Sequence, residues 1–205
     1  MRLLFAVLRM AAAIAGATAI IVTLEATVTA GTFVFTNFFG YFTIQGNVIC
    51  VVVYLLAAIA GFTHRTQGPW LVWARGAATT YIAIVGVVYN TLLTSANVGA
   101  LVPWANTMLH VIIPLYGVID WVLFGDRGAL PWRRVWLVLI YPLVWTGATL
   151  LRQAIEATPF IPYPFLNIGA LGGGVVTLYV IGIAVAFVAF GLLVWWASRT
   201  RILRP

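Results

Sequence analysis

Charged side chains are scarce in this sequence. Only 7% of its 205 residues are charged and 63% are hydrophobic, whereas a soluble domain carries about 25% charged residues. This shortage excludes a soluble globular domain and indicates an integral membrane protein. The polar stretches between the apolar runs are too short to fold alone, so we expect residues 1–205 to form a single domain.

Lysine is absent, and all 11 basic residues are arginines that flank apolar runs. The formal net charge of +7 could suggest a nucleic-acid partner. Arginines placed beside apolar runs are instead typical of residues that orient a protein in a membrane. We therefore expect membrane lipids around the chain and no nucleic-acid partner.

Several signatures of catalytic or metal chemistry are also missing. The single cysteine, Cys50, lies within an apolar run, which excludes a disulfide framework and a cluster of thiol ligands. The chain has no G-x-S-x-G elbow, no H-E-x-x-H motif and no second histidine in an apolar run. We therefore expect no metal and no cofactor.

Six apolar segments are each near the roughly 20 residues that a membrane-spanning helix needs. They run over Leu4–Leu24, Phe38–Phe62, Gly76–Thr94, Trp104–Phe124, Val135–Leu151 and Val175–Ala197. The predicted fold class is all-α, a polytopic membrane protein with six transmembrane helices.

The arginines predict the orientation of these helices. Our interpretation places Arg2 and Arg9 ahead of the alanine-rich run of the first helix, and Arg75 in the link between the second and third helices. Ten arginines then fall on one side of the membrane, and only Arg152 falls on the other. The arginine-rich side is normally cytoplasmic. We expect both termini to be cytoplasmic in a multi-pass protein of the plasma (cytoplasmic) membrane.

The stretch Trp104–Asp120 carries polar and ionisable residues inside an apolar run. Asn106, His110 and Asp120 are costly at membrane depth, so such residues usually face a bundle interior or a cavity. Pro114 has no N–H to offer the carbonyl of His110, four residues earlier. In a membrane a freed carbonyl is tolerated only where protein or water satisfies it. The sequence therefore predicts a bend and a polar pocket at His110.

Polar residues of three predicted helices lie at one depth below the outer surface. At 1.5 Å per residue, His110 is roughly 9 Å and Thr43 roughly 7.5 Å below the outer helix ends, and Asn90 is at a similar level. Asn47 and Asn106 are each one turn away from Thr43 and His110 on the same helix faces. This convergence predicts a single pocket in the outer half of the bundle.

The outer links differ from the arginine-rich inner ones. Glu25–Asn37 and Ser95–Pro103 have no basic residues, and the longest link, Arg152–Gly174, contains three prolines among aromatic residues. Prolines favour extended backbone there. This link is either an interfacial loop or a lid over the pocket, and the second interpretation puts Tyr163 and Phe165 at the mouth.

Asp120 lies apart from the polar layer, by which we mean the polar residues at the depth of Thr43, Asn90 and His110. It lies ten residues below His110, roughly 15 Å along the helix axis, so it cannot orient the imidazole. We expect a structural salt bridge between Asp120 and a cytoplasmic arginine, Arg75 or Arg133.

The side chains of the polar layer suit acyl transfer or ester hydrolysis. A hydroxyl such as that of Thr43 needs a base to become a nucleophile, and a histidine such as His110 can be that base near neutral pH. The amides of Asn47, Asn90 and Asn106 are candidate oxyanion donors, each worth about 3 kcal/mol in known cases. The alternative is that the threonine and histidine only hold helices together.

Three motifs in order resemble one superfamily. The runs Tyr41–Asn47 (YFTIQGN), Asn106–Pro114 (N-x-x-x-H-x-x-x-P) and Tyr163–Phe165 (YPF) are similar to those of the androgen-induced and androgen-dependent membrane proteins, above all to their prokaryotic six-helix branch. The resemblance implies an integral membrane hydrolase that cleaves fatty acid-type lipid esters. It also implies that Thr43 and His110 are the catalytic threonine and histidine.

A second function is compatible with the same layer. A small-molecule transporter or lipid-binding membrane protein would use the pocket to hold a polar headgroup without reacting. Transporters usually place such sites near the midplane between sequence repeats, and neither feature is visible here. A purely structural scaffold would not explain the shared depth of the polar residues.

Overall fold

The computed structural model describes residues 1–94, 101–200 and 202–203. The helices in this part of the chain are α1 (Arg2–Thr29), α2 (Phe35–Phe38), α3 (Phe42–Phe62), α4 (Pro69–Val88), α5 (Pro103–Thr107), α6 (Ile113–Leu123), α7 (Ile140–Ile155) and α8 (Ile168–Ala197). The π-helical turn η1 (Tyr89–Leu93) extends α4, and a second one, η3 (Met108–Ile112), joins α5 to α6. The 3-10 turns η4 (Trp132–Leu139) and η5 (Pro164–Leu166) precede α7 and α8.

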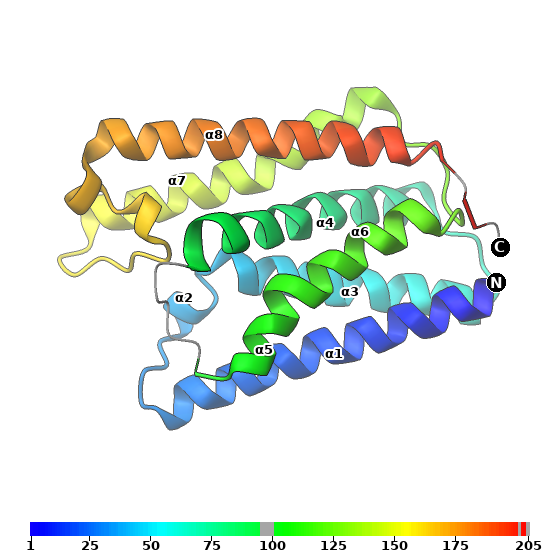
Figure 1. The fold of residues 1–205 in the computed structure, drawn as a ribbon, viewed down its shortest axis with the longest axis horizontal. Coiled ribbons are helices and arrows are strands. Elements are labelled where there is room, and N and C mark those ends of the chain that lie inside the picture. Colours follow the sequence, from blue (N-terminus) through cyan, green and yellow to red (C-terminus); the bar gives the residue numbers. More distant parts are fainter. Residues whose placement is uncertain (95–100, 201, 204–205) are drawn as a thin grey trace.

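The long helices form one elongated bundle (Figure 1). In the described residues six segments are long and apolar enough to cross a membrane, which confirms the predicted all-α, six-helix membrane fold. The bundle has two ends (Figure 1). We call the end where α1 begins and α8 finishes the terminal end. The opposite end, with α2 and η5, is the site end.

Two helices begin seven residues earlier than predicted. The start of α4 is Pro69 rather than Gly76, because proline is well suited to the first turn of a helix. The start of α8 is Ile168 rather than Val175, and the side chain of Asn167 accepts a hydrogen bond from the Ala170 N–H, 3.0 Å away. This cap satisfies one of the free N–H groups of the first turn.

Close packing between helices depends on glycine at two positions. A Cβ atom on Gly86 of α4 would lie 2.8 Å from Cβ of Pro114 in α6, and one on Gly117 of α6 would lie 2.7 Å from the Tyr54 hydroxyl of α3. Such distances forbid a larger residue without movement of the helices. The two glycines therefore fix α6 against α3 and α4, and with it the position of His110.

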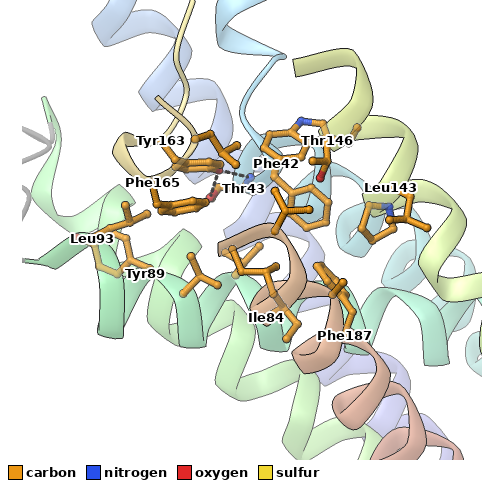
Figure 2. Close-up of a pocket in the computed structure, with 18 of the residues that line it drawn as sticks. Phe42, Thr43, Ile84, Tyr89, Leu93, Leu143, Thr146, Tyr163, Phe165 and Phe187 are labelled. Atoms are coloured by element: carbon orange, nitrogen blue, oxygen red, sulfur yellow. Dashed lines mark hydrogen bonds between the residues drawn. The ribbon is translucent and has the colours of Figure 1, made fainter. Parts of the chain in front are cut away.

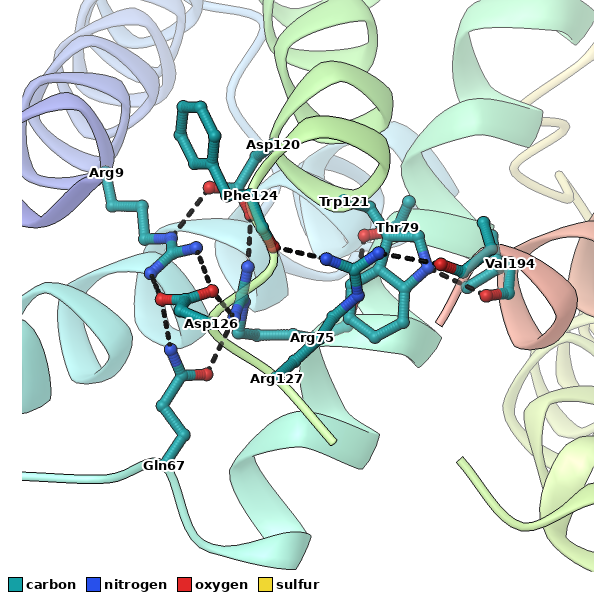
Figure 3. A network of polar contacts seen from close by, with 11 residues as sticks. Arg9, Gln67, Arg75, Thr79, Asp120, Trp121, Phe124, Asp126, Arg127 and Val194 are labelled. Atoms are coloured by element: carbon teal, nitrogen blue, oxygen red, sulfur yellow. Dashed lines mark hydrogen bonds and ion pairs between the residues drawn. The ribbon is translucent and has the colours of Figure 1, made fainter. Parts of the chain in front are cut away.

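A buried charged network ties the helices together at the terminal end (Figure 3). Asp120 of α6 accepts hydrogen bonds from Arg9 of α1 (2.7 Å) and from Arg75 of α4 (2.5 Å). Asp126, in the link after α6, also pairs with both arginines. Gln67 completes the network, donating to Asp126 (2.9 Å) and accepting from Arg75 (2.7 Å). Each buried guanidinium thus meets two carboxylates, as buried charges require.

This network corrects the predicted placement of several arginines. Arg9 and Arg75 lie inside α1 and α4 and are buried, not in the links that flank them. The predicted salt bridge of Asp120 with Arg75 is present. The alternative predicted partner, Arg133, is exposed in η4. The second partner of Asp120 is Arg9 instead. The sequence interpretation treats a charge inside an apolar run as the end of a helix. Burial with a carboxylate partner on another helix keeps it within the span.

Some predicted features lie beyond the part that the structure describes. Residues 95–100 of the link Ser95–Pro103 are outside the described residues, and so are Arg201 and Arg204, two of the ten arginines assigned to the cytoplasmic side.

Candidate functional site

The backbone around His110 is opened by Pro114, as the sequence predicts. The chain passes through the π-helical turn η3 before α6 resumes with Pro114 in its first turn. The side-chain amide of Asn90 donates to the carbonyl of His110 (3.4 Å), and that of Asn47 donates to the carbonyl of Leu109 (3.1 Å). Neighbouring helices therefore satisfy the carbonyls of the widened turn, as a membrane interior requires.

The ring of His110 is held in one orientation. Its Nδ1 lies 2.9 Å from the carbonyl oxygen of Asn106. A carbonyl can only accept, so in the neutral ring Nδ1 carries the proton and Nε2 is left as the basic nitrogen. One face of the ring stacks on Tyr89, with ring centroids 3.9 Å apart. The Tyr89 hydroxyl is in turn bound by the Asn106 side-chain amide.

Thr43 is the second residue of α3 and is buried, with 6% of its surface exposed. Its backbone N–H, one of the free donors of the helix N-terminus, donates to the hydroxyl of Tyr163 at 3.2 Å. The Thr43 hydroxyl also lies 3.2 Å from the same oxygen. Burial raises the pKa of Tyr163 to about 12, although its hydrogen bonds with Thr43 act in the opposite direction. The phenol therefore keeps its proton near neutral pH.

Thr43 and His110 line the same cavity, which has a volume of about 190 Å³. We call it the His110 cavity. Its walls come from α1, α3, η1, α5 and η3 and from the link before η5, and they include Tyr41, Asn106 and Tyr163. The hydroxyl of Thr43 is turned toward Tyr163, and the described contacts contain no hydrogen bond between Thr43 and His110. The cavity has room for several water molecules, since each occupies about 30 Å³ in the liquid.

The predicted oxyanion donors are placed differently from one another. Asn106 lines the His110 cavity. Asn47 and Asn90 are not among the described residues of its wall, and their amides are engaged with backbone carbonyls, including those of Thr43 and Gly86. The sequence interpretation that put both amides in the pocket is therefore corrected, since the π-helical turn needs them as donors.

A second, apolar pocket also borders Thr43 (Figure 2). It has a volume of about 70 Å³ and lies between α4, α7 and α8. We call it the Leu143 pocket. Phe165, predicted for the mouth of the polar cavity, lines this pocket instead and stacks on Tyr163, with ring centroids 5.3 Å apart. Tyr163 lines both spaces.

Sequence reasoning missed Tyr89 and two threonines of α1. Tyr89 lines both spaces and supports the His110 ring, while Thr23 and Thr27 line the His110 cavity. The signal was present in α1, because two threonines four residues apart share one helix face. Tyr89 lies next to Asn90, and the amide of Asn90 was the only signal that marked this part of the sequence as polar.

The described residues contain no group of three or more histidine, cysteine, aspartate or glutamate side chains arranged to hold a metal ion. The polar groups that face the His110 cavity are hydroxyls, one imidazole and one amide. What this set can do is exchange protons with a bound molecule and donate hydrogen bonds to it.

Comparison of the chain with protein-family models, with curated proteins and with solved structures finds no match. The resemblance of the three motifs to the membrane hydrolases stays a prediction. Function must therefore be argued from the geometry of the site.

Proposed function

We propose that this protein is an integral membrane hydrolase that cleaves lipid esters, with Thr43 as nucleophile and His110 as base. One observation carries the proposal. Thr43 at the start of α3 and His110 in the π-helical turn of another span both line one cavity inside an apolar bundle. Polar groups that converge at membrane depth are functional-site candidates because their burial is costly.

The proposed reaction proceeds through an acyl-threonine. The Thr43 oxygen attacks the ester carbonyl carbon while its proton passes to Nε2 of His110 through water in the cavity. The tetrahedral intermediate then expels the alcohol, which takes that proton. Water, activated by His110, hydrolyses the acyl-threonine and returns the proton to Thr43. This is the division of roles between nucleophile and base seen in serine hydrolases.

Tyr163 is the best-placed donor for the developing oxyanion. Its hydroxyl lies 3.2 Å from the Thr43 oxygen, so a carbonyl attacked by Thr43 is brought beside it. Because the pKa of Tyr163 is raised to about 12, its O–H remains available as a donor. The positive end of the α3 dipole adds to this stabilisation, since Thr43 lies in the first turn.

The proposed location is the plasma (cytoplasmic) membrane, with both termini inside. The terminal end then faces the cytoplasm, and the His110 cavity lies toward the outer leaflet. Membrane lipids supply the esters without passing through water.

Hydrolysis of lipid esters by the purified protein tests the proposal. Thr43→Ala removes the nucleophile and is expected to lower kcat by several orders of magnitude. Thr43→Ser keeps the hydroxyl and is expected to retain part of the activity. A fluorophosphonate probe is expected to label Thr43 covalently, as shown by peptide mass spectrometry. Hydrolysis by Thr43→Ala at the parent rate would refute the assignment.

The pH profile tests the base. Imidazolium cannot accept a proton, so activity is expected to fall as the pH drops through the pKa of His110. His110→Ala is expected to abolish this acid limb together with most of the activity. Adding the Thr43→Ala change to it should cost little more, because residues that act as a unit have non-additive losses.

A non-catalytic lipid-binding or transport function is the second candidate. It is favoured by the hydroxyl of Thr43, which is bound to Tyr163 rather than to His110. Under this function Thr43→Ala would change the affinity for a lipid ester, and the wild-type protein would release the ester intact.

A further inference from the structure

Two internal spaces of different chemistry meet at Thr43. Four residues line both the His110 cavity and the Leu143 pocket, namely Thr43, Tyr89, Leu93 and Tyr163. Figure 2 shows Thr43 and Tyr163 at one side of the Leu143 pocket, with Leu143 and Thr146 of α7 on another side. A molecule whose reacting atom sits at Thr43 therefore has two directions in which to extend.

The Leu143 pocket suits a hydrocarbon chain. Its walls are mainly aliphatic and aromatic, from Ile84 of α4 and Leu143 of α7 to Phe187 of α8. Leu143 is 52% exposed on the surface of the bundle, where lipid surrounds a membrane protein. The small volume of about 70 Å³ admits a slender chain, and a longer chain can continue past Leu143 into the bilayer.

The imidazole that can exchange protons with a bound molecule lies in the His110 cavity, although most of the wall of this cavity is also apolar. His110 and Asn106 line it, and neither belongs to the described wall of the Leu143 pocket. It also has more than twice the volume, about 190 against about 70 Å³. Proton transfer between His110 and the reacting atoms therefore takes place on the side of the His110 cavity.

We propose, resting on the function proposed above, that the Leu143 pocket holds the acyl chain of the ester and the His110 cavity holds its alcohol part. The same imidazole must protonate the departing alcohol and then activate water. Both the alcohol and the water therefore belong on the side of His110. The acyl chain takes the remaining direction, whose described wall contains no histidine.

The bonds balance with this arrangement. The bond between the Thr43 oxygen and the acyl carbon forms, and the bond between that carbon and the alcohol oxygen breaks. The proton of Thr43 passes through His110 to the alcohol, which leaves by the His110 cavity. Water enters by the same cavity and bonds to the acyl carbon while the bond between that carbon and the Thr43 oxygen breaks. One proton of the water passes through His110 to the Thr43 oxygen, and a fatty acid is released.

This assignment predicts two separate specificities. The Leu143 pocket should select slender, unbranched acyl chains, because branching beside the carbonyl meets its walls. The larger His110 cavity should tolerate alcohols of varied size. The substrate class is thus an ester of a linear acyl chain with a variable alcohol.

Two series of esters test the assignment on the purified protein. One series keeps 4-nitrophenol as the alcohol and varies the acyl chain from acetyl to octanoyl. The other keeps the octanoyl group and varies the alcohol. Ala184→Phe fills the Leu143 pocket from α8 and is expected to lower kcat/KM for octanoyl at least tenfold relative to acetyl. Ala189→Phe, on an exposed face of the same helix and outside the pocket wall, is the matched control and is expected to change neither series.

Two further variants test the assignment at positions other than Ala184, so that the result does not depend on the tolerance of that position for a phenylalanine. Leu143→Ala widens the pocket at its exposed side, away from Thr43, and is expected to admit acyl chains that branch far from the carbonyl, which the parent rejects. Thr27→Phe narrows the His110 cavity from α1 and is expected to change the alcohol series and leave the acyl series unaltered.

The outcomes separate this inference from the function on which it rests. If the parent protein hydrolyses no ester, the proposed function fails and the assignment fails with it. If the parent hydrolyses esters but Ala184→Phe and Leu143→Ala alter only the alcohol series, the function stands and the assignment is overturned. An effect of each variant on its own series alone supports the assignment.

Discussion

Tyr163 is the residue through which the link before α8 reaches the start of α3. Its hydroxyl accepts from the Thr43 N–H and contacts the Thr43 hydroxyl, both at 3.2 Å. A tyrosine outside the spanning helices thus caps the N-terminus of α3, a role that a serine or aspartate usually has. The sequence motif YPF predicted a residue at the mouth of the pocket. It did not predict a hydrogen bond to the nucleophile, because a contact across 120 positions leaves no trace in local spacing.

The change Tyr163→Phe tests the role of this hydroxyl. It removes the proposed oxyanion donor and is expected to lower kcat by about 10²-fold, as loss of one such donor does in known enzymes. KM should change little, because the aromatic ring remains. Kinetics with a fixed ester measure both constants. Tyr179→Phe, which removes the hydroxyl of a tyrosine of α8 that belongs to the described wall of neither space, is the control. An unchanged kcat in Tyr163→Phe would remove Tyr163 from the mechanism.

At the scale of helices, the number and order of the spans could be read from the sequence. Apolar runs of about 20 residues leave few alternatives, since the bilayer requires every backbone group to be satisfied within a helix. The bend at Pro114 could also be read, because proline removes a specific hydrogen bond. The starts of α4 and α8 could not. Arg75 is stabilised by carboxylates on other elements, and only the fold brings these together.

The π-helical turn η3 explains why two predicted oxyanion donors have another role. Asn47 donates to the carbonyls of Thr43 (2.9 Å) and Leu109 (3.1 Å) and is fully buried. Its amide therefore joins α3 to the turn that carries His110. Spacing along one helix placed Asn47 on the face of Thr43. That spacing could not show that the carbonyl of Leu109, in the turn η3, needs a hydrogen-bond donor.

The change Asn47→Ala is accordingly expected to affect stability. It leaves two buried carbonyls without a side-chain donor and should lower the free energy of unfolding by about 1–3 kcal/mol. Thermal unfolding in detergent measures the effect, with activity assayed at a temperature where the variant remains folded. The activity per folded molecule should stay within about tenfold of the parent, below the loss of about 10²-fold for an oxyanion donor. A larger fall in kcat with unchanged stability would restore Asn47 as an oxyanion donor.

At the scale of the whole molecule, the two ends of the bundle are specialised. The site end holds the His110 cavity. The terminal end holds the charged network of Arg9, Arg75, Asp120 and Asp126 (Figure 3). The arginine count predicts that the terminal end is cytoplasmic. Arg9 and Arg75 also have a structural role there, which the counting rule does not consider.

Cysteine labelling in intact cells tests this orientation. In a Cys50→Ala background, a cysteine at Thr200 is expected to be protected from a membrane-impermeant maleimide. A cysteine at Ala157, exposed in the link after α7, is expected to react. Disruption of the cells should make both positions reactive. Labelling of Thr200→Cys before disruption would reverse the orientation and place the His110 cavity toward the cytoplasm.

The charged network is expected to make stability depend on pH. Burial alone would raise the pKa of Asp126, but hydrogen bonds and charge from Arg9 and Arg75 outweigh it and hold that pKa below its usual range. A carboxyl whose pKa is lower in the folded state stabilises the fold at pH values above its unfolded pKa, about 3.9. That contribution disappears as the pH falls through the folded pKa. The unfolding temperature should therefore decline as the medium is acidified below about pH 4.

The change Asp126→Asn assigns this acid sensitivity to one side chain. It removes one of the two carboxylates that face Arg9 and Arg75, so the buried guanidiniums lose half of their counter-charge. Breaking a buried pair in this way costs about 3 kcal/mol or more at neutral pH. The variant should also lose much of its dependence on pH, because Asp126 no longer titrates. Glu156→Gln is the matched control: Glu156 also pairs with an arginine, Arg152, but both side chains are partly exposed (27% and 34%), and ion pairs in contact with solvent contribute little. Equal acid sensitivity in the parent and in Asp126→Asn would show that other carboxyls control unfolding in acid, and would leave the network with a role at neutral pH alone.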